Sequence, residues 1–176
     1  MKVLIAGGSK SGKTACALRL AMKLSENKKR YYTAAMIPCD DEDRARIDRH
    51  IAEREGMGFV TLEVGRDISS CMQTENGVYL IDSVTALLTN EMFSENGVDA
   101  QAKSRCLKGL KAVAERAESA IFVTDLIFSD AELYDPVTED FRASLASLNR
   151  ALAAECDTVI EMGCGNIICH KGAVPE

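Results

Sequence analysis

The stretch KVLIAGGSKSGKT, residues 2–14, decides the fold. A short apolar run is followed by GGSKSGKT, which fits the pattern G-x-x-x-x-G-K-[ST], and an amphipathic segment begins at Lys13. Glycines let the backbone wrap closely around a phosphate group, while consecutive N–H groups and a helix N-terminus supply partial positive charge. Because the loop stands between an expected strand and an expected helix, it indicates a binding site for nucleotide phosphates.

Outward from this loop, short apolar runs alternate with longer amphipathic segments. We expect strands at 2–6, 30–35, 58–63, 78–82, 120–125, 157–163 and 166–171, and helices at about 13–25, 41–55, 83–93, 100–118 and 137–155. This order predicts a mostly parallel sheet with helices on both faces, a three-layer α/β P-loop (RecA-like) domain over residues 1–176. Only three residues separate the last two strands, which predicts an antiparallel hairpin at one edge. Loops are expected at 94–100 and 128–136.

Composition excludes several classes of protein. The chain has 27 acidic and 21 basic residues, a net charge of −6, so it lacks the overall basic field that attracts nucleic acid. Its apolar runs are too short for a membrane span or a signal peptide, and we expect a cytoplasmic protein. The odd count of seven cysteines favours free thiols. Cys164, Cys169 and His170 match no standard zinc spacing, which disfavours a metal site there.

Two residues of the loop and one carboxylate carry the expected phosphate chemistry. Lys13 is expected to reach the β- and γ-phosphates, and the Thr14 hydroxyl is expected to hold Mg²⁺. The apolar run VYLID ends in Asp82, where a carboxylate can bind a magnesium water. Aspartate also caps helices well, so an N-cap role in the next helix suits Asp82 as well, either instead of the magnesium role or together with it. Asp125 ends another apolar run, and a turn or cap role suits it at least as well.

A second candidate is His50, in the expected helix DDEDRARIDRHIAERE at residues 40–55. Arg46 and Arg54 lie one turn before and one turn after it, on the same helix face. Two guanidinium groups keep an imidazole neutral and offer donors to a polyphosphate, and a neutral ring nitrogen can attack phosphorus to form a phosphoramidate. The alternative is an ordinary solvated helix with ion pairs between successive turns.

Taken together, these segments resemble the bifunctional adenosylcobinamide kinase / adenosylcobinamide-phosphate guanylyltransferase family of cobalamin biosynthesis, almost from end to end. GGSKSGKT resembles the family's P-loop, and DDEDRARIDRH resembles its D-E-x-x-x-R-I-x-x-H helix, in which the histidine becomes guanylylated. FVTLE resembles the W-x-T-x-E strand, with Phe59 in place of tryptophan and Glu63 as the glutamate. LIDSVTALLTN resembles L-x-D-C-L-T-x-x-x-x-N, and FRASLASLNRALAAECDTVIEMGCG resembles the F-R-D…G-x-x-N…A-D…G ending.

One segment departs from the family pattern. Where the family has N-E-V-G-x-G-I-V-P, this chain has DLIFSDAEL at residues 125–133, and Ala143 stands in place of the aspartate of F-R-D. The family's glutamate, both glycines and the proline are therefore absent. This loop is expected to shape part of the substrate site.

The resemblance implies two reactions. The enzyme would phosphorylate adenosylcobinamide and then transfer GMP from GTP to adenosylcobinamide phosphate through a guanylyl-histidine, giving adenosylcobinamide-GDP. It would use GTP, or ATP in the kinase step, with Mg²⁺ bound near Thr14 and Asp82, and would form a homotrimer. The candidate catalytic residues are His50, Lys13 and Arg46. The candidate nucleotide-binding residues are Gly7, Gly8, Ser9, Lys10, Ser11, Gly12, Lys13, Thr14, Thr33, Ala34, Ala35, Ile51, Ala52, Glu53, Arg54, Glu63 and Asp82.

Two other functions fit the same residues. The first is a P-loop kinase that acts on another small hydroxyl compound, with His50 in a structural role. The second is a non-catalytic, RecA-like nucleotide switch that regulates a partner. The chain contains no guanine-reading N-K-x-D motif, so a preference for guanine is implied by the resemblance alone.

Overall fold

The computed structural model describes residues 1–95 and 97–175. Residue 96, in the loop expected at 94–100, and residue 176, the last of the expected domain, lie outside the described residues. The main sheet has the strand order β3-β2-β4-β7-β1-β8-β9. In this order, neighbouring strands from β3 through β2, β4, β7 and β1 to β8 run parallel, and β9 pairs antiparallel with β8 at the edge. The mostly parallel sheet and its antiparallel edge hairpin are confirmed.

The described elements follow the expected alternation closely. The strands of the main sheet are β1 Lys2–Gly7, β2 Lys29–Ala34, β3 Phe59–Glu63, β4 Gly77–Asp82, β7 Ser119–Asp125, β8 Thr158–Gly163 and β9 Asn166–Lys171. The helices are α1 Lys13–Ser25, α2 Asp41–Glu53, α3 Val84–Met92, α4 Ala102–Arg116 and α5 Pro136–Glu155.

Three short elements are absent from the sequence-based prediction. A single turn of 3₁₀ helix, η1, spans Ile68–Cys71, and β5 Phe93–Ser94 pairs antiparallel with β6 Gly97–Val98 inside the loop expected at 94–100. Elements of two to four residues are too short to produce a recognisable hydrophobic period, which explains why they were missed.

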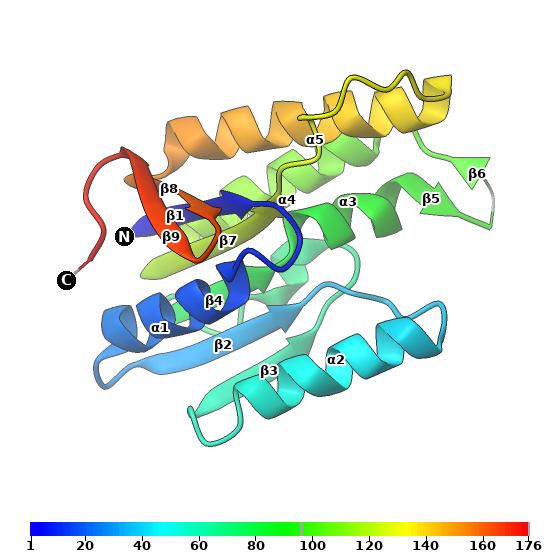
Figure 1. Cartoon of the computed structure of the whole chain (residues 1–176). Helices are drawn as coiled ribbons and strands as arrows, with labels where there is room; N and C mark the ends of the chain where they lie inside the picture. The colour runs from blue at the N-terminus through cyan, green and yellow to red at the C-terminus, as the bar shows by residue number, and fades with distance from the viewer. Residues whose placement is uncertain (96, 176) are drawn as a thin grey trace.

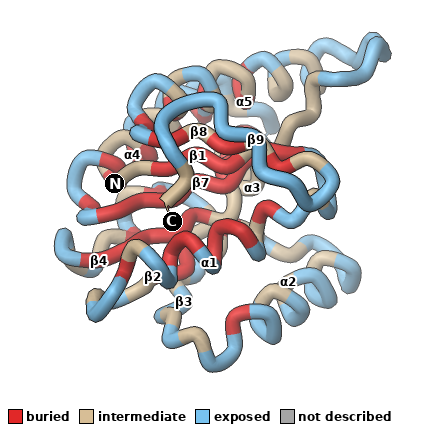
Figure 2. Tube along the Cα trace, turned by 60° about the vertical axis from the view of Figure 1, so that its left-hand side comes forward, coloured by how far each residue is buried: buried red, intermediate tan, exposed pale blue. Residues whose placement is uncertain are grey.

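Helices cover both faces of the sheet (Figure 1). α3, α4 and α5 pack against one another on one face, and α1 packs on the other. Figure 2 shows the resulting burial, with buried segments concentrated in the central strands and in α1. Central parallel strands that are covered on both faces need apolar side chains at successive positions, and residues 78–81 are fully buried. Three layers with two cores, one on each side of the sheet, are the result.

Successive tyrosines in β2 show how this sheet separates its two faces. Tyr31 belongs to the core beneath α3, α4 and α5 and stacks on Tyr79, with ring centroids 4.7 Å apart. Tyr32 points the other way, into the core beneath α1. Side chains alternate across a strand, so these neighbours have different surroundings. Tyr32 is thereby directed toward the face on which the P-loop helix lies.

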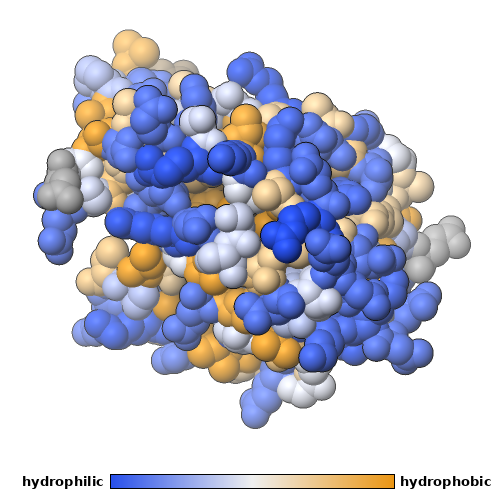
Figure 3. All heavy atoms as spheres, turned by 180° about the vertical axis from the view of Figure 1, so that it is seen from behind, coloured by the Kyte–Doolittle hydropathy of each residue, from blue (hydrophilic) through white to orange (hydrophobic). Residues whose placement is uncertain are grey.

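α2 differs from the other helices because none of its residues is buried. It forms by local signals: the Asp40 side chain caps its N-terminus by accepting from the Asp43 backbone N–H at 2.8 Å, and acidic residues fill the first turn. The rest of the surface is also largely polar. In the face shown in Figure 3, hydrophilic side chains cover most of the area around smaller apolar patches.

Candidate active site

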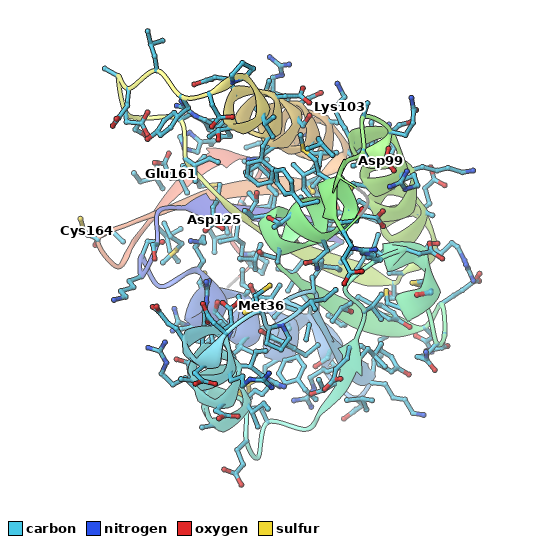
Figure 4. The ribbon with its side chains drawn as sticks, turned by 90° about the vertical axis from the view of Figure 1, so that its right-hand side faces the viewer. Met36, Asp99, Lys103, Asp125, Glu161 and Cys164 are labelled. Carbon is cyan, nitrogen blue, oxygen red and sulfur yellow. The ribbon has the colours of Figure 1, made fainter. Side chains whose placement is uncertain are left out.

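The carboxyl ends of the parallel strands meet at one edge of the sheet. Gly7 at the end of β1 pairs in register with Asp125 at the end of β7, and Ala34 of β2 pairs with Asp82 of β4. Figure 4 looks at this edge, with Asp125 and Met36 labelled near the middle of the view. Open α/β sheets bind their ligands at such an edge, so the candidate site lies where its fold class predicts.

The P-loop joins β1 to α1 with backbone geometry that only glycine accommodates at two points. A Cβ atom on Gly7 would lie 2.7 Å from both the Met162 carbonyl oxygen and Ser11 Oγ. Gly12 has a φ of 95°, in the left-handed region, and stands directly before α1. The loop therefore wraps as the sequence pattern predicts, and it leaves the N-terminus of α1 open to a ligand.

The Lys13 ammonium group is held inside the loop. Nζ donates to the carbonyl oxygens of Gly7 at 3.0 Å and Gly8 at 2.6 Å. It also pairs with Asp125 Oδ1 at 2.9 Å. The Asp125 carboxylate thus contacts the phosphate-binding lysine, and the cap of the following helix, α5, is Asp135 instead.

A cavity of about 530 Å³, hereafter the P-loop cavity, opens between the P-loop and α2. Its volume is within the range of sites that hold a small ligand such as a nucleotide. Its lining includes the expected residues Ser9, Lys10, Ser11, Gly12, Lys13, Thr14, Arg46, His50, Glu53 and Asp82. It also includes Arg49 and Asp125, so basic side chains from α2 face the phosphate-binding loop across the cavity.

The Asp82 carboxylate is the centre of a buried polar cluster. Its Oδ2 accepts from Tyr32 Oη at 2.7 Å and from Thr14 Oγ1 at 3.1 Å. Burial alone would raise the pKa of Asp82, but hydrogen bonds from His50, Tyr32 and Thr14 hold it below its ordinary value. Burial and the neighbouring Asp82 charge raise the pKa of Tyr32. Asp82 is therefore an ionised acceptor, and Tyr32 a neutral donor.

The N-cap alternative for Asp82 is wrong. Ser83, the next residue, is the N-cap of α3, and its Oγ accepts from the Ala86 backbone N–H at 3.2 Å. A serine hydroxyl satisfies the helix terminus as well as an aspartate does. The Asp82 carboxylate is left to face Thr14 and α2.

His50 joins α2 to this cluster. Its Nδ1 lies 3.2 Å from Tyr32 Oη and 3.5 Å from Asp82 Oδ2, and its side chain is 24% exposed. The ring lines both the P-loop cavity and a small adjoining pocket of about 40 Å³. A helix with no buried residue of its own is thus tied to the sheet by its histidine.

The two arginines beside His50 lie in different environments. Arg46 lines the P-loop cavity, but Arg54 is 8% exposed and turned toward β2 and β3. Its guanidinium carbon is 4.2 Å from the centroid of the Tyr32 ring, and its Nε and Nη2 donate to Thr61 Oγ1 at 3.2 and 3.1 Å. Of the two arginines expected beside the reacting phosphate, only Arg46 lines the P-loop cavity, while both line the small adjoining pocket.

Several other expected contacts are not brought to the P-loop cavity. Ala34 lines only the small pocket, and Thr33 is fully buried in the sheet. Within the described chain, neither pocket beside His50 is lined by Gly7, Gly8, Thr33, Ala35, Ile51, Ala52 or Glu63. For Thr33, Ala35 and Glu63, a place at or near a strand end does not by itself determine which way the side chain points, and a nucleotide contact by any of these residues stays a prediction.

The oxygen atoms at Thr14 and Asp82 fit a magnesium ion. A hydroxyl and an ionised carboxylate converge within 3.1 Å beside the phosphate-binding loop. Hard divalent cations take oxygen donors, and Mg²⁺ in nucleotide sites is held by one or two protein groups together with phosphate oxygens and waters. Thr14 would be a direct ligand, and Asp82 would hold one of the waters.

Sequence reasoning missed Tyr32 and Arg49. Tyr32 stands in an expected strand, where an aromatic side chain is usually part of the core. Only its hydroxyl group distinguishes it from an ordinary core residue. Arg49 is one of four arginines in residues 44–54, and the pattern gives no reason to prefer it. A tyrosine two residues before a strand's carboxyl end, on the face of the P-loop helix, is the signal that could have identified Tyr32.

Fold and site together define a P-loop nucleotide-binding protein, with the phosphate loop, the strand-end carboxylate and the helix N-terminus in one cavity. The chain belongs to the cobinamide kinase / cobinamide phosphate guanyltransferase family, whose sequence pattern it matches over residues 3–169. Membership supports kinase and guanyltransferase activity in cobalamin biosynthesis, and cobinamide substrates, at the level of the family. No curated protein is similar enough to the chain to count as a match.

Two solved structures are similar to this chain at low sequence identity. The flagellar accessory protein FlaH from Methanocaldococcus jannaschii has a TM-score of 0.48 and 17% identity, over 97% of this chain and 78% of that one. The ATP synthase subunit NeqB from Nanoarcheaum equitans has a TM-score of 0.55 and 10% identity, over 92% of this chain. This chain spans 45% of the length of NeqB. The likeness to NeqB shows the fold alone.

None of the helices in the described part of the chain combines the length and the hydropathy that spanning a membrane requires.

Proposed function

We propose that residues 1–176 form one transferase domain that phosphorylates adenosylcobinamide and then transfers GMP from GTP to the product through a guanylyl-His50 intermediate. One observation carries the proposal. His50 and the P-loop line the same cavity, so a triphosphate bound by the loop extends beside the imidazole. The same cavity supplies Arg46 and Lys13 to neutralise phosphate charge. Family membership gives the substrate class, and the cavity supports the assignment of residues.

In the kinase step the chain positions the triphosphate. Lys13 Nζ, now bonded to backbone carbonyls and to Asp125, would turn to the β- and γ-phosphates, while backbone N–H groups at the start of α1 bind their oxygens. The substrate hydroxyl then attacks the γ-phosphorus in line, its proton passes to solvent, and the bond to the bridging oxygen breaks so that the nucleoside diphosphate leaves. GTP or ATP serves as donor. A magnesium ion held through Thr14 and Asp82 would supply neutralisation of phosphate charge.

In the guanylyl step a neutral His50 nitrogen attacks the α-phosphorus of GTP. The N–P bond forms as the bond to the bridging oxygen breaks, and pyrophosphate leaves with that electron pair. The phosphate of adenosylcobinamide phosphate then attacks the same phosphorus, and the N–P electron pair returns to His50. Arg46 stabilises the charge that develops on the phosphoryl oxygens.

Labelling with GTP tests the guanylyl step directly. Incubation with GTP radiolabelled at the α-phosphate should leave label on the protein in an acid-labile, base-stable bond, and adenosylcobinamide phosphate should remove it. His50→Ala should take up no label. His170→Ala is the matched control because the chain has two histidines, and His170 lies on β9 with its Nε2 2.8 Å from Glu161. Label retained in His50→Ala would refute the proposal.

A kinase for a different small hydroxyl compound is the second candidate. It is favoured by residues 125–133, which lack the family's motif after the fifth strand of the parallel series and leave Leu133 94% exposed. This candidate predicts transfer of the γ-phosphate to another acceptor, with no label from α-labelled GTP. The two candidates are separated by measuring transfer of the γ-phosphate from labelled GTP or ATP to adenosylcobinamide and to a panel of small alcohols.

The family resemblance also supports a homotrimer, while the charge balance and the short apolar runs support a cytoplasmic protein that binds no nucleic acid. Light scattering on the full chain gives the molar mass, which should be three times the 19.1 kDa of one chain. A mass of one or two chains would contradict the trimer and leave the labelling experiment unaffected.

A further inference from the structure

Three side chains from three elements form a continuous hydrogen-bonded path, Asp82–Tyr32–His50. Asp82 Oδ2 accepts from Tyr32 Oη at 2.7 Å and from Thr14 at 3.1 Å, as a carboxylate does. Tyr32 has one hydroxyl proton, and this proton is committed to Asp82. Its oxygen can then only accept from His50 Nδ1, which lies 3.2 Å away. The proton on the imidazole must therefore be on Nδ1.

Packing fixes the position of the Tyr32 hydroxyl. The residue is 3% exposed, and the Arg54 guanidinium lies over one face of its ring, 4.2 Å from the centroid. Phe59 meets the ring edge-on, with centroids 6.5 Å apart and planes at 87°. Arg54 is itself held by Thr61 through two N–H groups. The hydroxyl consequently has no room to turn away from Asp82 and His50.

The unprotonated ring nitrogen is then Nε2. Within residues 1–95 and 97–175, no hydrogen-bond partner contacts this nitrogen, while the His50 ring lines the P-loop cavity. The tautomer of a neutral histidine is determined by the hydrogen bond that its other nitrogen makes. A buried donor-acceptor pair on the Nδ1 side thus leaves the lone pair of Nε2 available to a ligand.

We propose that Tyr32 is a positioning residue that fixes His50 as the Nδ1–H tautomer, so that Nε2 is the atom that bonds to the α-phosphorus of GTP. This inference rests on the proposed guanylyl function. As the N–P bond forms and pyrophosphate departs, the ring becomes positively charged and Nδ1 keeps its proton. That charge faces Asp82 Oδ2 at 3.5 Å and is stabilised by it.

The tautomer can be measured without any reaction. The full chain is labelled with ¹⁵N-histidine and carries His170→Asn, so the spectrum reports His50 alone. At alkaline pH, Nδ1 should appear as the protonated nitrogen and Nε2 as the unprotonated one, and Tyr32→Phe should reduce the Nδ1–H population. A protein with Tyr32 intact that shows the proton on Nε2 overturns the inference.

The rate of guanylylation tests whether Tyr32 positions His50 for the reaction. In a single-turnover assay at saturating GTP, Tyr32→Phe should slow guanylylation of His50 by about 10- to 100-fold, the usual effect of losing a group that orients a functional histidine. Affinity for GTP should change less than about threefold, because Tyr32 does not line the P-loop cavity. Tyr31→Phe is the matched control, since Tyr31 is equally buried but faces the opposite core. Guanylylation at the unsubstituted rate in Tyr32→Phe overturns the inference.

The outcomes separate this inference from the proposed function. If the unsubstituted protein takes no label from GTP, the guanylyl function fails, whereas the tautomer is still decided by the nitrogen spectrum. If the unsubstituted protein is labelled and Tyr32→Phe reacts equally fast, only the role of Tyr32 fails. If Tyr32→Phe does not fold, the spectrum of the protein with Tyr32 intact still decides the tautomer.

Discussion

Lys13 and Asp125 form an ion pair of 2.9 Å inside the P-loop cavity. A triphosphate needs the same ammonium group, and the carboxylate that holds it would repel phosphate oxygens. The family resemblance places an asparagine at this position, where this chain has an aspartate. Asp125 is therefore expected to reduce nucleotide affinity in this protein.

Replacing Asp125 by asparagine should strengthen nucleotide binding. Removal of one negative charge beside Lys13 should tighten the dissociation constant of a non-hydrolysable GTP analogue by about fivefold, on the order of 1 kcal/mol. Isothermal titration calorimetry measures the change. Glu118→Gln is the control, because Glu118 makes a similar pair with Lys28 at 2.8 Å on the exposed surface. Weaker binding by Asp125→Asn would mean that the carboxylate serves mainly to orient the lysine.

Adjacent glycines of the P-loop should respond differently to alanine. A Cβ on Gly7 would lie 2.7 Å from a backbone oxygen, whereas a Cβ on Gly8 would meet no atom within 4 Å. Gly7→Ala should lower the free energy of unfolding by about 1–3 kcal/mol, and Gly8→Ala by less than about 0.5 kcal/mol. Urea titration of the nucleotide-free proteins compares them. Equal stabilities would show that the loop can relax around the added methyl group.

Substitutions of Arg46 in α2 and of Arg54, just beyond its end, should separate effects on nucleotide binding from effects on stability. Arg46→Ala should weaken GTP binding by about tenfold, because the side chain lines the P-loop cavity. Arg54→Ala should change GTP affinity little and destabilise the fold by about 1–3 kcal/mol, because it removes the contacts with Tyr32 and Thr61. Calorimetry and thermal unfolding of both variants give the comparison. The reverse pattern would place Arg54, and not Arg46, at the phosphates.

The seven cysteines should fall into two reactivity classes. Burial raises the pKa of the Cys71 thiol to about 11 and that of Cys106 to about 12, and Cys16 and Cys156 are also buried. A raised pKa leaves less of the reactive thiolate at any pH below it. At pH near 8, a thiol-specific alkylating reagent should modify exposed Cys39, Cys164 and Cys169 rapidly, and the other four only after unfolding. Peptide mass spectrometry identifies the sites; rapid labelling of Cys106 in folded protein would contradict its burial.

The sequence was sufficient to predict the framework of the site. The P-loop pattern has a single backbone solution, so Lys13 and Thr14 could be placed from their spacing alone. The mostly parallel sheet was implied by the alternation of strands and helices, and the edge hairpin by its three-residue turn, whereas the order of the strands came only from the structure. His50 could be selected because histidine is rare in this chain and stands among arginines.

What the sequence could not provide was the direction of individual side chains. Whether Asp82 or Ser83 caps α3 depends on backbone geometry at one residue, and either side chain is a good cap. Arg54 and Arg46 are equivalent by helical spacing, but α2 ends at Glu53, and Arg54 beyond it packs over Tyr32 of β2 and Thr61 of β3. The Tyr32 hydroxyl acquires its partners only when three elements distant in the sequence come together.

Because α2 is exposed, its sequence can vary with little effect on the stability of the fold. The helix that carries His50 contributes no buried residue, whereas the residues that orient His50 belong to β2 and β4. Substitutions along the outer surface of α2 can alter charge and acceptor preference while thermal stability stays nearly constant. Directed-evolution libraries confined to residues 41–49 should therefore yield mostly well-folded variants.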